Sequence, residues 1–195
     1  IEDMVTVPQY MKEIVAEITS LARKSPEINQ RSGVSVRVTI ANYETIMSNA
    51  IRRAIATREK GCVPRITDLT AILPSMSGKI ELETVEEGRE PRIVEDLTRK
   101  AVLNVFVRYF IVGDLDTLLA RFDEGAVMET GNEIPSREYV KRTKRLVEIT
   151  EALKQLGATG SPALIAAGTE FVLEGLHLSR RLNRDRVEGR YLYRS

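Results

Sequence analysis

The chain has 195 residues, 43% of them hydrophobic, which is enough for one large or two small packed domains. Its 29 Lys and Arg residues nearly balance 28 Asp and Glu residues, so the net charge gives no reason to expect a nucleic-acid or membrane partner. A single Cys excludes an internal disulfide and fits a reducing, cytoplasmic location, and no apolar run is long enough to cross a bilayer.

The first eighty residues predict three helices. Thr6 and Gln9 have the spacing of a capping box, and apolar residues then recur every three or four positions up to Pro26, which predicts a helix over 7–24. A short third helix is expected between residues 64 and 74, where one proline can open it and another can stop it.

The second helix is expected over 38–58. It follows a turn in which Ser32 or Ser35 can cap its start, and Gly61 lies just beyond its end. The periodicity predicts that one apolar stripe faces the core. Its members are Ile40, Tyr43, Ile46, Met47, Ala50, Ile51, Ala54 and Ile55.

The rest of the chain also has a helical pattern. Helices are expected over 92–111, 137–156 and 162–182, with a short one after Asp114. Residues 79–83 alternate like a strand but have no evident partner, and 123–135 is expected to be a loop. We therefore predict an all-α protein, with a three-helix bundle in residues 1–86 and a second helical bundle in residues 87–195.

Arg37 falls in or near the first turn of the second helix. A cation there opposes the helix dipole, which favours anions at the amino end. An anion beside Arg37 would remove this conflict, because the free N–H groups of a helix start also bind anions. By position alone, an ordinary surface arginine beside a helix cap is the simpler interpretation of Arg37, and an anion-binding role is the alternative that the surrounding sequence favours.

The segment around Arg37 resembles the helical lid of AAA+ ATPases of the magnesium-chelatase/MoxR clade. The resemblance rests on three pieces in order: Arg31-Ser32-Gly33-Val34-Ser35-Val36-Arg37, a long helix ending in Arg52-Arg53, and Arg65-Ile66-Thr67-Asp68-Leu69 after a short loop. It implies that residues 1–86 form the lid domain and that Arg37 is the sensor 2 residue, which touches the nucleotide γ-phosphate.

The resemblance also implies what lies outside this sequence. The chain starts at Ile1 without Met, and we expect it to be a fragment whose missing N-terminal core binds ATP and Mg²⁺. Neighbouring subunits would form a ring and remodel a partner protein. The fragment itself is expected to lack ATPase activity, because Ser77-Gly78-Lys79 lacks the earlier glycine and the following Ser or Thr of a P-loop.

Other chemically active residue types favour structural interpretations. His177 and Cys62 are the only His and Cys, so no metal site or Cys–His pair is indicated by spacing. The acidic run Glu81, Glu83, Glu86 and Glu87 is expected to be a solvated loop, and Arg52-Arg53 and Arg180-Arg181 are expected to lie on polar helix faces.

A second function remains open at this point. The tail over 180–195 holds six Arg residues, so the chain could instead be a stand-alone helical interaction module that binds protein or nucleic acid through this tail. The presence or absence of a P-loop and a Walker B segment upstream in the gene discriminates between the two hypotheses.

Overall fold

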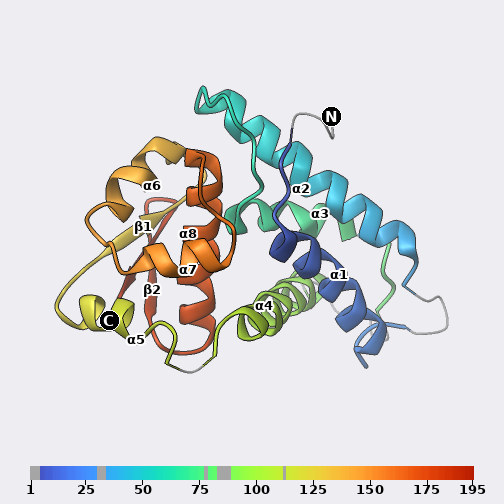
Figure 1. The fold of residues 1–195 in the computed structure, drawn as a ribbon. Coiled ribbons are helices and arrows are strands. Elements are labelled where there is room, and N and C mark those ends of the chain that lie inside the picture. Colours follow the sequence, from blue (N-terminus) through green and yellow to red (C-terminus); the bar gives the residue numbers. More distant parts are fainter. Residues whose placement is uncertain (1–4, 30–33, 77–78, 83–88, 112) are drawn as a thin grey trace.

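The computed structural model describes residues 5–29, 34–76, 79–82, 89–111 and 113–195 (Figure 1). α1 (Gln9–Lys24) and α2 (Val36–Ala56) cross and pack against each other. Both bounds agree with the predicted helices to within two residues. The apolar face of α1 is also the predicted one, because Tyr10, Ile14 and Ile18 are buried.

The predicted cap of α1 is wrong. Pro8 precedes the helix and no side chain caps it, whereas the Gln9 amide donates to Glu13 one turn further on. Thr6 is unavailable as a cap because it continues an extended segment, in which its backbone N–H donates to the carbonyl of Cys62. Pairing with a distant segment therefore overrides the local capping pattern.

The third helical segment starts as expected but does not stop at Pro74. It consists of a 3-10 helix, η2 (Ile66–Ala71), followed directly by α3 (Ile72–Met76). Pro74 lies inside α3, where it is tolerated because the first turn of a helix does not need its N–H. Beyond it, Leu82 forms a single antiparallel bridge to Ile28 rather than a strand.

α4 (Arg89–Tyr109) and α8 (Pro162–Leu178) form the centre of the molecule. α4 packs against both α1 and α8, and Ser161 caps α8 by accepting a hydrogen bond from the N–H of Leu164. One hydrophobic cluster includes residues of α1, α2, α4 and α8. The predicted boundary between residues 86 and 87 lies outside the described residues, so the division into two domains stays a prediction.

The prediction of one long helix over 137–156 is wrong. The structure has two short helices, α6 (Ser136–Thr143) and α7 (Ile149–Gln155), separated by a turn that places Leu146 in the core. α5 (Asp116–Asp123) confirms the short helix after Asp114. α8 ends at Leu178, four residues before the predicted end, and Arg180 has a positive φ of 62°.

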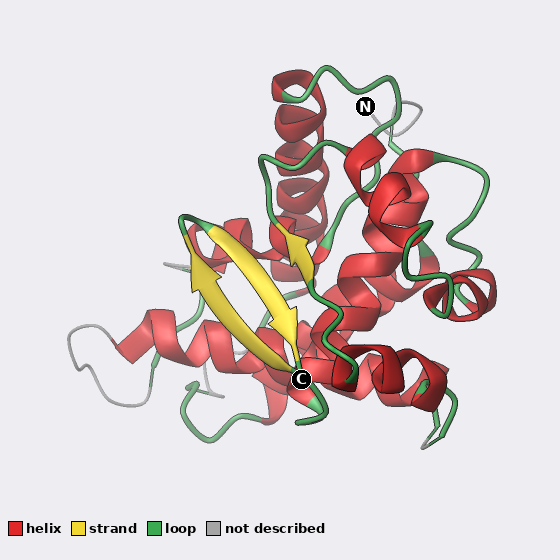
Figure 2. Cartoon of the chain, turned by 90° about the vertical axis from the view of Figure 1, so that its left-hand side faces the viewer, coloured by secondary structure: helices red, strands yellow, loops and turns green. Residues whose placement is uncertain are grey.

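The expectation of an all-α fold also needs correction, because a chain that is mostly helical carries a small sheet. β1 (Met128–Thr130), β2 (Asn183–Val187) and β3 (Arg190–Arg194) pair antiparallel in the order β1-β3-β2 (Figure 2). Glu188 and Gly189, with φ of 49° and 80°, make the tight turn between β2 and β3. The sequence does not predict the two strands of the tail, because arginines interrupt the alternation of apolar residues that would indicate a strand.

The close contact between α8 and α4 predicts a strong effect of Gly175→Ala. A Cβ at Gly175 would lie 2.0 Å from the ring of Phe106. Ala is favoured over Gly in a helix by about 1 kcal/mol, but overpacking typically costs about 1–3 kcal/mol, and a contact this short belongs at the upper end of that range. We expect a clear net loss in the free energy of unfolding, measured by urea denaturation.

Gly61→Ala is the matched control. Its Cβ would lie 3.6 Å from the Cβ of Ala163, which is an ordinary contact. This variant should unfold at nearly the same urea concentration as the parent chain. A Gly175→Ala variant as stable as Gly61→Ala would contradict the close packing of α8 on α4.

Candidate functional site

Arg37 lies at the exposed amino end of α2. The hydroxyl of Ser35 caps the helix by accepting a hydrogen bond from the N–H of Arg37 at 3.2 Å, which confirms one of the two predicted caps. The other, Ser32, lies outside the described residues. Within the described part of the chain, the Arg37 guanidinium has no hydrogen bond or ion pair and is available to an anion.

A groove of about 1050 Å³ runs between α1 and α2 beside this helix start. Val36 and Ile40 of α2 line it and are 62% and 52% exposed. Lys12 and Lys24 of α1 also line it, which makes the groove both apolar and basic. An exposed apolar surface of this kind commonly marks an interaction site.

The predicted buried stripe of α2 is therefore partly wrong. Ile46, Met47, Ala50 and Ala54 are buried, but Ile40 and Ile55 are exposed. In their place the inward face carries Asn42, Asn49 and Arg53. The helix is rotated from the orientation that hydrophobicity alone favours, because its carboxyl end joins a buried polar network.

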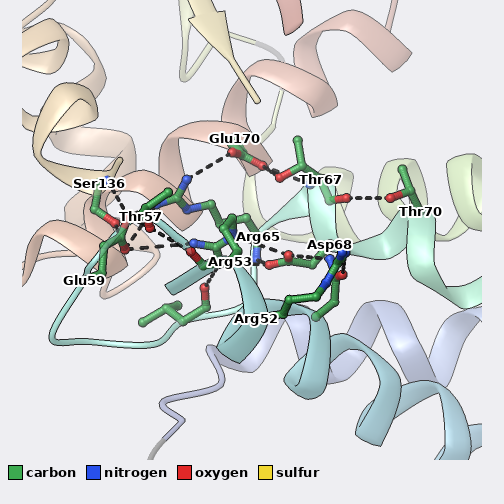
Figure 3. Close-up of polar contacts among 12 residues, drawn as sticks. Arg52, Arg53, Thr57, Glu59, Arg65, Thr67, Asp68, Thr70, Ser136 and Glu170 are labelled. Atoms are coloured by element: carbon green, nitrogen blue, oxygen red, sulfur yellow. Dashed lines mark hydrogen bonds and ion pairs between the residues drawn. The ribbon is translucent and has the colours of Figure 1, made fainter. Parts of the chain in front are cut away.

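Arg53 and Asp68 form the first part of that network (Figure 3). Arg53 Nη2 lies 2.9 Å from Asp68 Oδ2 and 2.8 Å from the carbonyl oxygen of Val63. Burial alone would lower the pKa of Arg53, but the hydrogen bonds and charge of Asp68 outweigh it and raise the pKa. The pair thus stays charged in the interior, which corrects the expectation that Arg53 lies on a polar face.

Arg65 extends the network to the second half of the chain. It is fully buried and donates to the carbonyl of Ile134 and the hydroxyl of Ser136, while its Nη2 lies 3.2 Å from Glu59 Oε1. Tyr139 of α6 covers the guanidinium, with its ring centroid 4.8 Å from Cζ. A residue of the Arg65–Leu69 motif therefore fixes the start of α6.

Glu170 of α8 completes the network. One carboxylate oxygen accepts hydrogen bonds from the N–H and hydroxyl of Thr67, both at 2.9 Å, and the other accepts from Tyr139 at 2.6 Å. Four elements, α2, η2, α6 and α8, are thus joined through ionic or hydroxyl side chains. Sequence reasoning missed the roles of Ser136 and Glu170, although a glutamate inside an apolar helix was a visible signal.

The remaining sequence candidates have structural surroundings. His177 Nδ1 lies 3.1 Å from the carbonyl oxygen of Leu182 at the end of α8, which fits its structural interpretation. Cys62 is partly buried, and burial raises its pKa, so the thiol is a poor nucleophile at neutral pH. Lys79 donates to the carbonyl of Ser75. Ser77, Gly78, Glu83, Glu86 and Glu87 lie outside the described residues.

The arginine-rich tail is largely neutralised. Arg181 pairs with Asp116, Arg184 with Glu174, Arg190 with Glu129 and Arg194 with Asp185. Arg180 and Arg181 are both exposed but lie beyond the end of α8 at Leu178, so the prediction that they lie on a polar helix face is wrong. Because four of the six arginines have carboxylate partners, the tail presents less free positive charge than its sequence indicates.

Asp68→Ala is expected to be strongly destabilising. It leaves Arg53 buried without its charged partner, and breaking a buried pair in this way costs about 3–5 kcal/mol. Urea unfolding monitored by circular dichroism measures the loss. Glu151→Ala, which breaks an exposed pair with Lys154, should cost about 0.5 kcal/mol or less. Equal effects of the two variants would contradict a structural role for the buried network.

Glu59 predicts an acid-sensitive contribution to stability. Burial would raise its pKa, but the hydrogen bonds from Ser136 and the charge of Arg65 together lower it below its ordinary value of 4.5. A carboxyl with a depressed folded-state pKa stabilises the fold above its unfolded pKa, and this contribution is lost as pH falls through the folded value.

The expected result is that Glu59→Gln lowers stability at pH 7 and flattens the fall in stability below pH of about 4.5. Unfolding free energies measured across this range test it. Glu133→Gln, at an exposed position with no hydrogen bond or ion pair among the described residues, should follow the parent curve. If the stability of Glu59→Gln fell as steeply as that of the parent chain below pH 4.5, the proposed contribution of Glu59 would be contradicted.

Comparisons with models of known protein families, with curated protein sequences and with solved structures find no match. Among the described residues, no group of three or more His, Cys, Asp and Glu side chains is placed to hold a metal ion. In the same part of the chain, no helix has the length and apolar character needed to cross a membrane. A functional assignment therefore depends on the geometry of the residues themselves.

Proposed function

We propose that this chain is the C-terminal part of an AAA+ ATPase that resembles the ATPase subunit of magnesium chelatase. Residues 1–86 are its lid domain and residues 87–195 a second helical domain. The core that binds ATP and Mg²⁺ precedes Ile1 in the full protein, and cytoplasmic ring-forming subunits couple hydrolysis to the remodelling of a partner protein. The observation that supports this most directly is the unpartnered guanidinium of Arg37 at the capped start of α2.

The chemistry of Arg37 suits a γ-phosphate. A guanidinium stays charged at all physiological pH values and matches phosphate oxygens with a planar fork of donors. In phosphoryl transfer, negative charge moves toward the leaving β-phosphate oxygens, so a positioned cation can both hold nucleotide and favour hydrolysis. Arg37 is the residue assigned to this role, as sensor 2.

The surroundings of Arg37 also fit a face that closes on another domain. Val36 and Ile40 are exposed directly beside it and line the groove between α1 and α2. A nucleotide-binding core that covers this face would bury both side chains and bring Arg37 to the phosphates. The buried network near the other end of α2 would hold the helix firmly at Arg53, about 24 Å from Arg37 along its axis, while it moves with the lid.

The test is Arg37→Ala in the full-length protein. Loss of one charge-assisted contact should weaken nucleotide binding only moderately, because the P-loop contacts remain. Hydrolysis should fall by roughly a hundredfold or more, since the lost charge acts on the transition state. ATPase rate and nucleotide affinity are measured together. Arg37→Lys should recover little activity, because a point charge does not reproduce the planar fork.

Arg92→Ala is the matched control, because Arg92 is an exposed arginine of α4 with no hydrogen bond or ion pair among the described residues. It should leave turnover near that of the parent protein, and both variants should unfold like the parent. Normal turnover and affinity in Arg37→Ala would remove the proposed role. A stand-alone helical interaction module would then be the better hypothesis, and an upstream sequence without a P-loop would lead to the same conclusion.

A further inference from the structure

A cavity of about 430 Å³ lies between the η2–α3 segment and the second half of the chain, and Arg37 does not line it. It is enclosed by η2 and α3, by α4, by α8 and by the β2–β3 hairpin, whose strands lie alongside the helices in Figure 2. Its volume is in the range of pockets that bind small molecules. We call it the hairpin pocket, and nothing in the proposed nucleotide role of Arg37 uses it.

The walls of the hairpin pocket are mainly apolar. Leu69 and Leu73 line one side, Val94 and Val102 of α4 line another, and Leu178 at the end of α8 closes a third. These side chains offer a ligand no hydrogen bonds. They favour an apolar group that leaves water when it binds.

The two buried carboxylates of the pocket, Glu170 and Glu174, already have partners. Both oxygens of Glu174 accept from Arg184, at 2.6 and 2.7 Å, and one also accepts from the hydroxyl of Tyr193 at 2.7 Å. Arg184 also lies over the ring of Tyr191, 4.6 Å from its centroid. Glu170 is satisfied by Thr67 and Tyr139 as described above. An anionic head therefore gains no free cationic partner from these two carboxylates and the groups that pair with them.

Free charge is found instead on exposed lining residues. Arg99 of α4 and Arg186 of β2 both line the pocket, and neither has a hydrogen bond or ion pair within the described residues. Glu95 also lines it, one turn before Arg99, but does not pair with it. Since the buried carboxylates already have cationic or hydroxyl partners, the unpartnered charges are two arginines against one glutamate.

We propose that the hairpin pocket binds a small molecule with an apolar body and one anionic head, a carboxylate or a phosphate. The body occupies the space between α4, α8 and the hairpin, and Arg99 and Arg186 hold the head at the exposed side. Two guanidinium groups from separate elements can each donate a charge-assisted hydrogen bond to one anion.

The probe for the test is 8-anilinonaphthalene-1-sulfonate, an aromatic anion, titrated by fluorescence into residues 1–195. The parent chain should bind it saturably. The double variant Arg99→Gln with Arg186→Gln should bind it at least about tenfold more weakly, because each lost charged contact accounts for a change of this order. Binding of the neutral analogue N-phenyl-1-naphthylamine should be unchanged by the same substitutions.

Competition identifies the anionic head. Decanoate and decyl phosphate are each used to displace the bound probe, and the one that displaces at lower concentration indicates whether a carboxylate or a phosphate is preferred. Decanol, which has the apolar body without the charge, should displace the probe only at a much higher concentration. The proposal is overturned if neither anion displaces the probe. It is also overturned if decanol displaces the probe at the same concentration as the anions.

The basic groove between α1 and α2 is the competing location for an apolar anion. A Lys12→Gln and Lys24→Gln variant alters that groove alone and should bind the probe as the parent does. Arg92→Gln controls for the loss of positive charge on α4. The proposal is overturned if the parent shows no saturable binding, if the lysine variant loses it, or if the Arg99 and Arg186 double variant retains full affinity.

Discussion

The buried network of charges around Arg53 and Arg65 is the constraint on which the arrangement of this chain depends. A charged group inside a protein is strongly unfavourable unless other charges and hydrogen bonds compensate it. Arg53 has Asp68, and Arg65 has Glu59, Ser136 and the carbonyl of Ile134. These partners come from segments far apart in sequence, so the network can be satisfied only when α2, η2 and α6 are in their observed places.

The network also explains which face of α2 is exposed. Because Arg53 and Asn49 must face Asp68, the carboxyl end of the helix turns polar side chains inward. Ile40 and Ile55 then remain on the outside, although their spacing favours burial. The apolar surface beside Arg37 is thus a consequence of where the charges are buried, and it is the surface that the proposed lid function requires.

α8 organises the second half in a similar way. Glu170 and Glu174 lie one turn apart on this otherwise apolar helix, and each anchors a different part of the chain. Glu170 accepts hydrogen bonds from Thr67 and Tyr139, whereas Glu174 holds Arg184 and Tyr193 of the hairpin. The hairpin pocket exists because these two carboxylates attach η2 and the sheet to neighbouring turns of one helix.

The sequence by itself determined the positions of α1, α2, α4 and most of α8, since apolar periodicity, prolines and the Ser35 and Ser161 caps are local signals. It also indicated that Arg37 begins a helix. Only the tertiary structure decided the inward turn of Arg53, the break between α6 and α7, and the pairing of β1 with β3, in which Met128 lies opposite Tyr193 from the far end of the chain. Long-range pairing of charges and strands has no local signature, because the partners are brought together by the fold and not by spacing along the chain.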